Sequence, residues 1–221
     1  MYEITSGRWR TPRGHVADML YRRDTNDYNT IQSAIGEDEY GLAALHLEGH
    51  ALDIGAHIGS VSIALALDNP GLQVTAVEAV PPNVELLEQN IERNGVSDRV
   101  SVIEGAAGDG SPVKVRWGVA GSDSALHHAF IGNAVLSAVA SGGETATYLG
   151  SYALADLAQG PICFAKIDCE GCEYPFLQGP ALAHIERIHG EEHGAALNLP
   201  GLDVTYTQDN TPRGFVAVRC G

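Results

Sequence analysis

The chain has 221 residues, of which 44% are hydrophobic and 19% are charged, and this composition is typical of a single domain with a sizeable core. Its 28 acidic and 13 basic side chains give a formal net charge of −15, which disfavours binding to nucleic acid or anionic lipid and favours a small or uncharged partner. No apolar run reaches the roughly 18 residues that a membrane span needs, and the first residues are polar, unlike a signal peptide. We therefore expect a cytoplasmic protein.

The N-terminal part carries weak structural signals. Residues 1–30 are polar and irregular, and we expect a solvated arm with a short hairpin. Alternatively, the stretch RRDTNDYN forms a lid over a ligand pocket. Residues 31–47 have apolar side chains at loose helical spacing, broken by Gly36 and Gly41, which predicts one interrupted helix.

Strands and helices alternate through the next segment. The stretch HALDIGAHIG, residues 50–59, predicts a buried strand, a tight glycine turn and the start of a helix. A second strand, LQVTAVEA, contains Glu78, a second helix runs from Pro81 to near Gly95, and residues 99–103 form a third strand. Short connections between these elements predict a parallel sheet with right-handed crossovers, and hence a doubly wound α/β fold.

The second half of the chain continues the sheet after an insertion. Residues 111–150 lack helical periodicity and predict a β-hairpin-like insertion that carries the loop HHAFIGNA. A short helix, YALADLAQ, precedes a strand, ICFAKID, that ends at Asp168. A fifth strand, HIERIHGEE, follows, and DVTYTQ with FVAVRC predicts an antiparallel hairpin at the C-terminal end.

The glycine turn limits the kind of nucleotide that the fold binds. A dinucleotide fingerprint has a glycine between Gly55 and Gly59, whereas this chain has His57, which disfavours a pyrophosphate and with it a nucleotide-dependent dehydrogenase. Asp53 would repel a phosphate but accept a hydrogen bond from an ammonium group. Glu78, one strand later, is placed to accept hydrogen bonds from ribose hydroxyls.

The end of the third strand completes the predicted ligand. Residues 104–109, which include Ala106, would pass beside an adenine. Adenosine with a methionine-like tail is S-adenosylmethionine, which we predict as the cofactor. A binding or regulatory protein that keeps the fold without catalysis is a third class, and the intact glycine loop disfavours it.

Three segments carry a family resemblance: ALDIGAHIGSVSIALA, AVEAVPPNVELLEQNIERNG and KIDCEGCEYPFLQG. They resemble the FkbM-type class I methyltransferases, whose motif after the fourth strand is close to K-I-D-x-E-G-x-E, and the likeness covers roughly residues 24–193. It implies a Rossmann-like, mostly parallel seven-stranded sheet, S-adenosylmethionine as donor and S-adenosylhomocysteine as product. It also implies O-methylation of a small-molecule hydroxyl, often in secondary metabolism, with N- or C-methylation as alternatives.

The resemblance assigns residues and regions. Asp53, Gly55 and Gly59 match the first motif, and Glu78 matches the acidic residue that binds the ribose. Five residues match the fourth-strand motif: Lys166, Asp168, Glu170, Gly171 and Glu173. We also predict His57, in the glycine loop, and Asp168 as cofactor contacts. The single methyltransferase domain would comprise an N-terminal arm or lid with a helix (1–47), a cofactor-binding half (48–110), the insertion (111–150) and a substrate-side half (151–221).

Cys169 and Cys172 form a CxxC inside this motif. A structural zinc site needs two further ligands, and neither Cys163 nor Cys220 begins a second CxxC. Family members have small apolar residues at the two positions. We therefore interpret the pair as packing residues rather than as a zinc or thiol redox site.

The predicted catalytic residues follow the fourth and fifth strands. Methyl transfer from a sulfonium is an in-line displacement, so the enzyme must align the nucleophile and remove a proton from an alcohol. Asp168 and Glu170 follow the fourth strand, and Glu192 and His193 follow the fifth. We predict His193 as the general base, because an unperturbed pKa of about 6.5 suits proton removal at neutral pH, with Glu170 as second choice.

Other residues are predicted near the substrate. His127 and His128, in the inserted loop, are candidate substrate contacts, together with Glu192. Asp168, Glu192 and His193 could alternatively hold a divalent cation that acidifies the substrate hydroxyl. We do not favour this version and predict no metal site.

Overall fold

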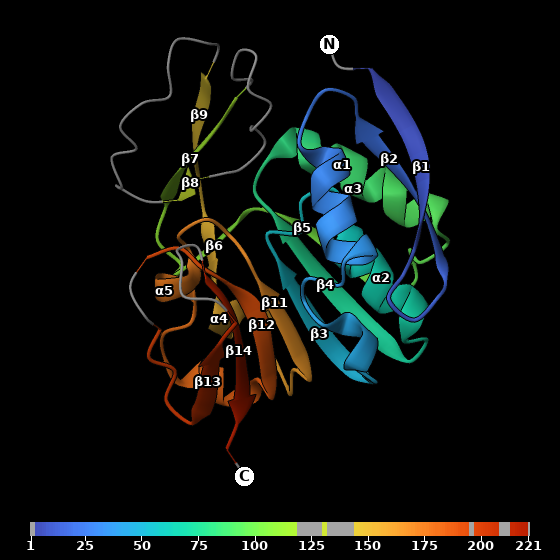
Figure 1. Ribbon diagram of the computed structural model, residues 1–221. Coiled ribbons are helices and arrows are strands. Elements are labelled where there is room, and N and C mark those ends of the chain that lie inside the picture. Colours follow the sequence, from blue (N-terminus) through green and yellow to red (C-terminus); the bar gives the residue numbers. More distant parts are fainter. Residues whose placement is uncertain (1–2, 119–129, 132–143, 195–196, 208–212, 221) are drawn as a thin grey trace.

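A seven-stranded sheet forms the centre of the computed structural model, which describes residues 3–118, 130–131, 144–194, 197–207 and 213–220. Its strands are β3 (Gly49–Ile54), β4 (Leu72–Glu78), β5 (Val100–Glu104), β11 (Phe164–Ile167), β12 (Arg187–Glu192), β13 (Leu202–Tyr206) and β14 (Arg213–Arg219). They lie in the order β13-β14-β12-β11-β3-β4-β5 (Figure 1).

The pairing confirms the predicted fold class. Strands β5, β4, β3, β11 and β12 pair in parallel, and β14 is antiparallel to both of its neighbours, β12 and β13. After β3 the chain adds β4 and β5 on one side of that strand. It then adds β11 on the other side of β3, and β12, β14 and β13 continue the sheet in that direction. This reversal between β3 and β11 is the place where open α/β sheets form a crevice at the carboxyl ends of their strands.

Helices cover both faces of the sheet. The helices α2 (Ser60–Asp68) and α3 (Pro81–Arg93) lie on one face (Figure 1). The opposite face packs against α4 (Leu154–Leu157), α5 (Glu173–Phe176) and a 3-10 helix, η3 (Pro180–His184).

The side chains of β3 point alternately to the two faces of the sheet and pack into both hydrophobic cores. Ala51 packs into the α2 side, whereas Leu52 and Ile54 pack into the opposite core. All three side chains are fully buried, and full burial of a Leu or Ile side chain stabilises the fold by about 1.5–3 kcal/mol.

The longer helix, α3, begins and ends as predicted. Helix α3 starts at Pro81, where the missing N–H costs no intrahelical hydrogen bond. It is followed by Gly95 with φ +65°, a left-handed conformation that ends the helix.

An N-terminal hairpin packs against α3. Its strands are β1 (Ile4–Arg10) and β2 (Val16–Arg22), which pair antiparallel. Ala17 and Met19 of β2 are fully buried in the core. The predicted hairpin is present, but the expectation of a solvated arm is wrong, because alternate residues of β2 are apolar and pack on the helices.

Two asparagines of α3 complete the hydrogen bonds of β2. Asn90 Oδ1 accepts from the Leu20 amide at 2.7 Å, and its Nδ2 donates to the Leu20 carbonyl at 3.1 Å. Asn94 repeats this with Asp18, at 2.9 Å for both bonds. Residues four apart lie on one face of a helix. Asn90 and Asn94 therefore pair with the backbone groups of two alternate residues of β2, Leu20 and Asp18.

Residues 31–47 differ from the predicted single helix. Ile31 is the last residue of α1 (Asp27–Ile31). A π-helical turn, η1 (Gln32–Gly36), follows directly, and a separate 3-10 turn, η2 (Leu42–Ala44), comes after it. The Asp38 carboxylate accepts hydrogen bonds from the first amides of η2, and Gly41 has φ +63°. These local bonds and the left-handed glycine separate the turns.

The insertion forms a small sheet of its own. Strands β7 (Val113–Gly118), β8 (Phe130–Ile131) and β9 (Glu144–Leu149) pair antiparallel in the order β8-β7-β9. Most of the loop HHAFIGNA lies outside the described residues.

A short strand pair joins the insertion to the rest of the chain. Strand β6 (Ala106–Gly108) pairs in parallel with β10 (Ser151–Ala153), so β10 takes up the start of the predicted helix YALADLAQ and leaves α4 one turn long. Within the described residues, no helix has the length and apolar character that crossing a membrane requires.

Candidate functional site

A pocket lies at the carboxyl ends of β3, β4 and β11, where the strand order reverses. Its wall is built by the loop after β3, the end of β4, the start of β6, the end of β11 and part of residues 30–40. Five predicted cofactor residues line it: Gly55, His57, Glu78, Ala106 and Asp168.

The loop after β3 requires glycine at its first position. Gly55 has φ +76°, and a Cβ there would stand 1.8 Å from the Asp168 carbonyl oxygen. His57 and Gly59 are also left-handed, with φ +53° and +96°. This backbone brings the loop against β11 and starts α2 at Ser60, with the helix N-terminus at the pocket.

Glu78 faces the pocket from the end of β4 and is 6% exposed. Its Oε2 accepts a hydrogen bond from the His57 amide at 2.8 Å, and its Oε1 accepts from the Val80 amide at 2.8 Å and Asn83 Nδ2 at 3.3 Å. Burial raises the pKa of Glu78 despite these bonds. A carboxylate accepts about four hydrogen bonds, so a hydroxyl of a bound molecule has an acceptor here.

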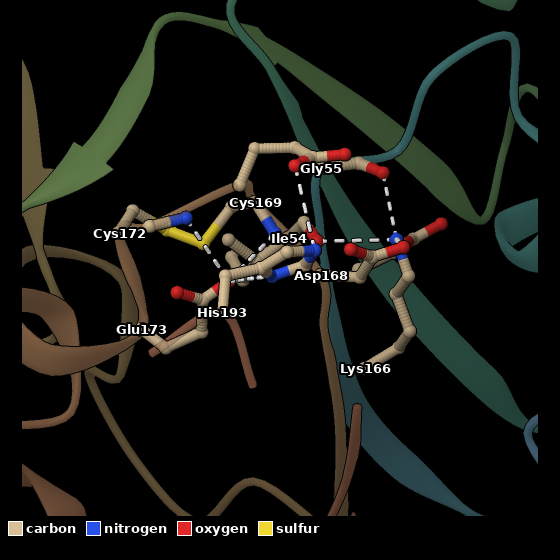
Figure 2. The surroundings of a disulfide bond; sticks show 11 residues. Ile54, Gly55, Lys166, Asp168, Cys169, Cys172, Glu173 and His193 are labelled. Atoms are coloured by element: carbon tan, nitrogen blue, oxygen red, sulfur yellow. Dashed lines mark hydrogen bonds and ion pairs between the residues drawn. A yellow bond between two sulfur atoms is a disulfide. The ribbon is translucent and has the colours of Figure 1, made fainter. Parts of the chain in front are cut away.

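Asp53 lies behind the pocket wall. It is fully buried, its Oδ2 accepts from Ser62 Oγ at 2.6 Å, and its Oδ1 is 3.5 Å from Lys166 Nζ. The Lys166 ammonium also donates to the Gly55 carbonyl at 2.7 Å (Figure 2). Asp53 thus supports the loop through Lys166, whereas the sequence predicts direct contact with a ligand ammonium group.

Lys166 remains a cation in this position. Burial by itself would lower its pKa, but the carboxylates of Asp53 and Asp168 raise it above the usual value. The buried ammonium therefore ties β11 to the glycine loop.

Glu39 and Tyr40 also line the pocket and carry no motif in the sequence. Tyr40 Oη donates a hydrogen bond to Asp168 Oδ2 at 2.9 Å, and Lys166 Nζ lies 5.6 Å from the centre of the Tyr40 ring. They lie between two turns in an irregular segment, so only the folded chain brings them to the pocket.

The stretch RRDTNDYN reaches the glycine loop through one residue. The Asp27 carboxylate lies 3.2 Å from His57 Nε2 and pairs with Arg22 at 2.8 Å. Thr30, just after this stretch, lines the pocket. The N-terminal segment thus contributes Thr30 to the pocket wall and Asp27 to a contact with the glycine loop, and the lid itself stays a prediction.

The ends of β11 and β12 meet beside the pocket. One ligating atom each from Asp168, Glu170 and His193 lies within 4.8 Å of the other two. His193 Nε2 is 3.4 Å from Glu170 Oε2, and its Nδ1 is 3.0 Å from Glu173 Oε1. The fold therefore brings together three of the predicted catalytic residues.

The surrounding carboxylates control the charge of His193. Burial by itself would lower its pKa, but the hydrogen bond to Glu173 and the charges of Glu170 and Glu173 raise it to about 9. At neutral pH the imidazole therefore carries two protons. Glu191 lies 3.7 Å from His193 Nε2, and burial together with the Asp168 charge raises the pKa of Glu191 to about 7.

Two predicted substrate contacts are placed differently or are not described. Glu192 is fully buried and accepts a hydrogen bond from Tyr174 Oη at 3.0 Å, apart from the cluster around His193. His127 and His128 lie outside the described residues.

Cys169 and Cys172 form a disulfide, with their Cα atoms 5.4 Å apart (Figure 2). The interpretation of the pair as unbonded packing residues is therefore wrong. The tight turn through Glu170 (φ +55°) and Gly171 (φ +104°) places the two Cα atoms within the range that a disulfide spans. The CxxC spacing is the same for a disulfide-bonded pair and for two unbonded buried cysteines, so the sequence alone does not distinguish them.

The comparisons with known proteins identify a family and two curated relatives. A profile described as the methyltransferase FkbM domain matches residues 53–199. Over 78 residues the chain is 43% identical to the cobalt-precorrin-6B C(15)-methyltransferase (decarboxylating) of Salmonella typhimurium, a match that covers 35% of the chain and 40% of that protein. Over 64 residues it is 36% identical to the O-methyltransferase imqG of Aspergillus flavus, covering 29% of the chain and 26% of that protein. These matches span less than half the length of either relative.

Solved structures show more remote likenesses. The precorrin-6y C5,15-methyltransferase from Geobacter metallireducens is 12% identical, with a TM-score of 0.47 over 82% of the chain and 85% of that protein. An O-methyltransferase from Bacillus cereus, solved in complex with SAH, is 19% identical, with a TM-score of 0.45 over 77% of the chain and 74% of that protein.

Proposed function

The chain belongs to the FkbM methyltransferase family, and on this basis we propose that it transfers a methyl group from S-adenosylmethionine bound in the pocket between β3, β4 and β11. The observation that carries the proposal is the position of Glu78. Its buried carboxylate faces the pocket beside the glycine loop, where a ribose hydroxyl can donate to it. Methyl transfer is the chemistry that the cofactor supplies.

The residues of the pocket fit the remaining parts of this cofactor. The start of β6, with Ala106, forms an apolar wall suited to an adenine ring. Asp168 and Glu39 bring carboxylates to the pocket, and they suit the ammonium group of a methionine-like tail. We assign this contact to Asp168 in place of Asp53, which lies behind the wall.

A small-molecule hydroxyl is the acceptor that we propose. Three acidic side chains, Glu39, Asp168 and Glu170, line the pocket, which favours a neutral or cationic acceptor over a nucleic acid. Oxygen as the acceptor atom rests on family resemblance, because the names of the curated relatives include both an O- and a C-methyltransferase.

His193 is our candidate for the base, and Glu170 is the alternative. The Glu173 carboxylate fixes the orientation of His193 and leaves its Nε2 toward Glu170 and Asp168, at the edge of the pocket. For His193 to accept a proton from the acceptor hydroxyl, it must first lose the proton that it holds at neutral pH.

A divalent cation is a second version of the same mechanism. The atoms of Asp168, Glu170 and His193 are close enough together to share one ion, with Glu170 in place of the predicted Glu192. Such an ion would acidify the acceptor hydroxyl. Turnover that is unchanged by EDTA would eliminate this version.

Calorimetry with S-adenosylmethionine and S-adenosylhomocysteine tests the cofactor assignment. We expect Glu78→Ala to weaken binding by about 10–100-fold, because hydrogen bonds to a charged acceptor contribute roughly 1.5–3 kcal/mol. Glu85→Ala is the matched control, since Glu85 is exposed on α3 and does not line the pocket. Circular dichroism establishes that both variants are folded, and Glu78→Gln tests the charge with the side-chain shape retained. Failure of the wild type to bind either compound would refute the proposal.

Replacement of His193 tests the base. We expect His193→Ala to lower turnover by more than about tenfold while cofactor affinity stays unchanged. Undiminished turnover would transfer the role to Glu170.

A further inference from the structure

The disulfide closes the turn that positions the catalytic candidates. Between its two cysteines lie only Glu170 and Gly171. The amides of Cys169 and Gly171 donate to Glu173 Oε1 at 3.4 and 3.3 Å, and the same oxygen lies 3.0 Å from His193 Nδ1 (Figure 2). The cross-linked turn therefore holds the carboxylate that orients His193.

The two sulfur-bearing residues differ in access. Cys169 is 8% exposed and belongs to the wall of the cofactor pocket, whereas Cys172 is fully buried. Thiol–disulfide exchange requires a thiolate to reach one sulfur of the pair. Because Cys169 lines the pocket, the pocket offers a small thiol an approach to this residue.

We propose that Cys169 and Cys172 are a reversible redox pair that small thiols and disulfides of the glutathione class reach through the cofactor pocket. One part of this proposal rests on the proposed function, namely that bound cofactor blocks access to the pair. As a consequence, the backbone of the turn that holds Glu173 is more rigid in the disulfide form than in the dithiol form.

Dithiothreitol reduces the pair in two exchange steps. One thiolate of the reagent attacks the Cys169 sulfur, a mixed disulfide forms, and Cys172 leaves as a thiolate that takes up a proton. The second thiol of the reagent then displaces Cys169, which also takes up a proton. The pair gains two electrons and two protons, and dithiothreitol is oxidised to its cyclic disulfide. Glutathione disulfide reverses the change and is reduced to two glutathiones.

Alkylation with iodoacetamide and mass spectrometry of the folded full chain and its peptides test the pair. After treatment with glutathione disulfide we expect an intact Cys169–Cys172 disulfide peptide, and glutathione attached to Cys163 or Cys220 is identified by its added mass on the peptides that contain them. After dithiothreitol both cysteines should be alkylated. In the control Cys163→Ser the disulfide peptide should be unchanged. Alkylation of Cys169 and Cys172 despite oxidation would overturn the proposal, as would a disulfide that is reduced only after the chain is unfolded.

Saturating S-adenosylhomocysteine tests the route of access. We expect it to slow reduction by at least about tenfold, because exchange rates depend on access to the sulfur. In Cys172→Ser, it should equally slow the formation of a mixed disulfide between glutathione and Cys169. Unchanged rates despite calorimetric binding would refute the route. Absence of calorimetric binding would instead refute the proposed function, while the alkylation pattern still decides the redox pair.

Amide hydrogen exchange tests the effect on the turn. Exchange in residues 168–176 should become faster on reduction, and exchange in residues 60–68, within α2, should stay the same. Equal exchange in the oxidised and reduced forms would show that the disulfide does not hold the turn.

Discussion

The ion pair between Arg22 and Asp27 provides the sharpest test of how the N-terminal segment is held. Both side chains are almost fully buried, at 3% and 1% exposure, and Asp27 accepts from Arg22 Nε at 2.8 Å and Nη2 at 2.9 Å. Asp27→Ala would leave the guanidinium buried without its carboxylate. Removal of one partner of a buried pair costs about 3–5 kcal/mol, a large part of the roughly 5–15 kcal/mol that stabilises a typical domain.

Urea unfolding followed by circular dichroism measures this loss. With a denaturant slope of roughly 2–3 kcal/mol per molar urea, the midpoint should fall by about 1–2 M. Asp18→Ala is the matched control, because Asp18 pairs with Arg8 and Arg93 at the surface and its loss should leave the midpoint nearly unchanged. Equal midpoints for Asp27→Ala and Asp18→Ala would refute the reasoning.

A double variant separates the buried charge from the lost packing. Arg22→Met combined with Asp27→Ala removes both charges, and we expect it to be more stable than Asp27→Ala alone. If the loss of unfolding free energy in the double variant equals the sum of the losses in the two single variants, the two side chains do not interact in this way.

The stability of the pair also depends on pH. Burial by itself would raise the pKa of Asp27, but hydrogen bonds from His57 and Arg22 hold it well below its usual value of 3.8. Its contribution is therefore complete above pH 3.8 and is lost as the pH falls toward the lower folded-state pKa. The difference in stability between the wild type and Asp27→Ala should shrink on acidification below about pH 4, as urea titrations at several pH values will measure; a constant difference would contradict this.

Two further predictions concern the site itself. Gly55→Ala should lower the thermal midpoint strongly or prevent folding, because its Cβ would overlap the Asp168 carbonyl. Gly14→Ala carries the backbone strain of a positive φ without this overlap, so it should lower the midpoint clearly less than Gly55→Ala does. If His193 is the base, turnover at saturating cofactor should rise with pH and level off above about 9, because the raised pKa keeps the imidazole protonated below that pH. A rate that is flat between pH 6 and pH 10 would remove His193 from proton transfer.

The cofactor half of the molecule was predictable because its signals are local. Glycines at defined positions, a carboxylate at the end of the next strand, and proline and glycine at the ends of α3 each act within a few residues of the chain. The alternation of strands with helices then restricts the sheet to few topologies. The parallel core of the sheet and the antiparallel terminal hairpin follow from this pattern, whereas the number of seven strands was an implication of the family resemblance.

Contacts between distant segments were not predictable in the same way. Tyr40 reaches Asp168 across 128 positions, and Asp27 meets His57 only after the hairpin packs on α3. No local periodicity encodes such meetings. The disulfide is local, but whether two nearby cysteines bond depends on the backbone of the turn between them.

The pairing of β2 with Asn90 and Asn94 has a consequence for association between copies of the chain. A strand with unpaired backbone groups is a template on which another extended chain can add. Here a helix occupies two of those positions with side-chain amides, and each amide turns one N–H and its carbonyl oxygen toward the strand, as a peptide group does. Leucine at both positions would leave the backbone groups of Asp18 and Leu20 without these partners, and we expect this edge of β2 to become more prone to β-aggregation.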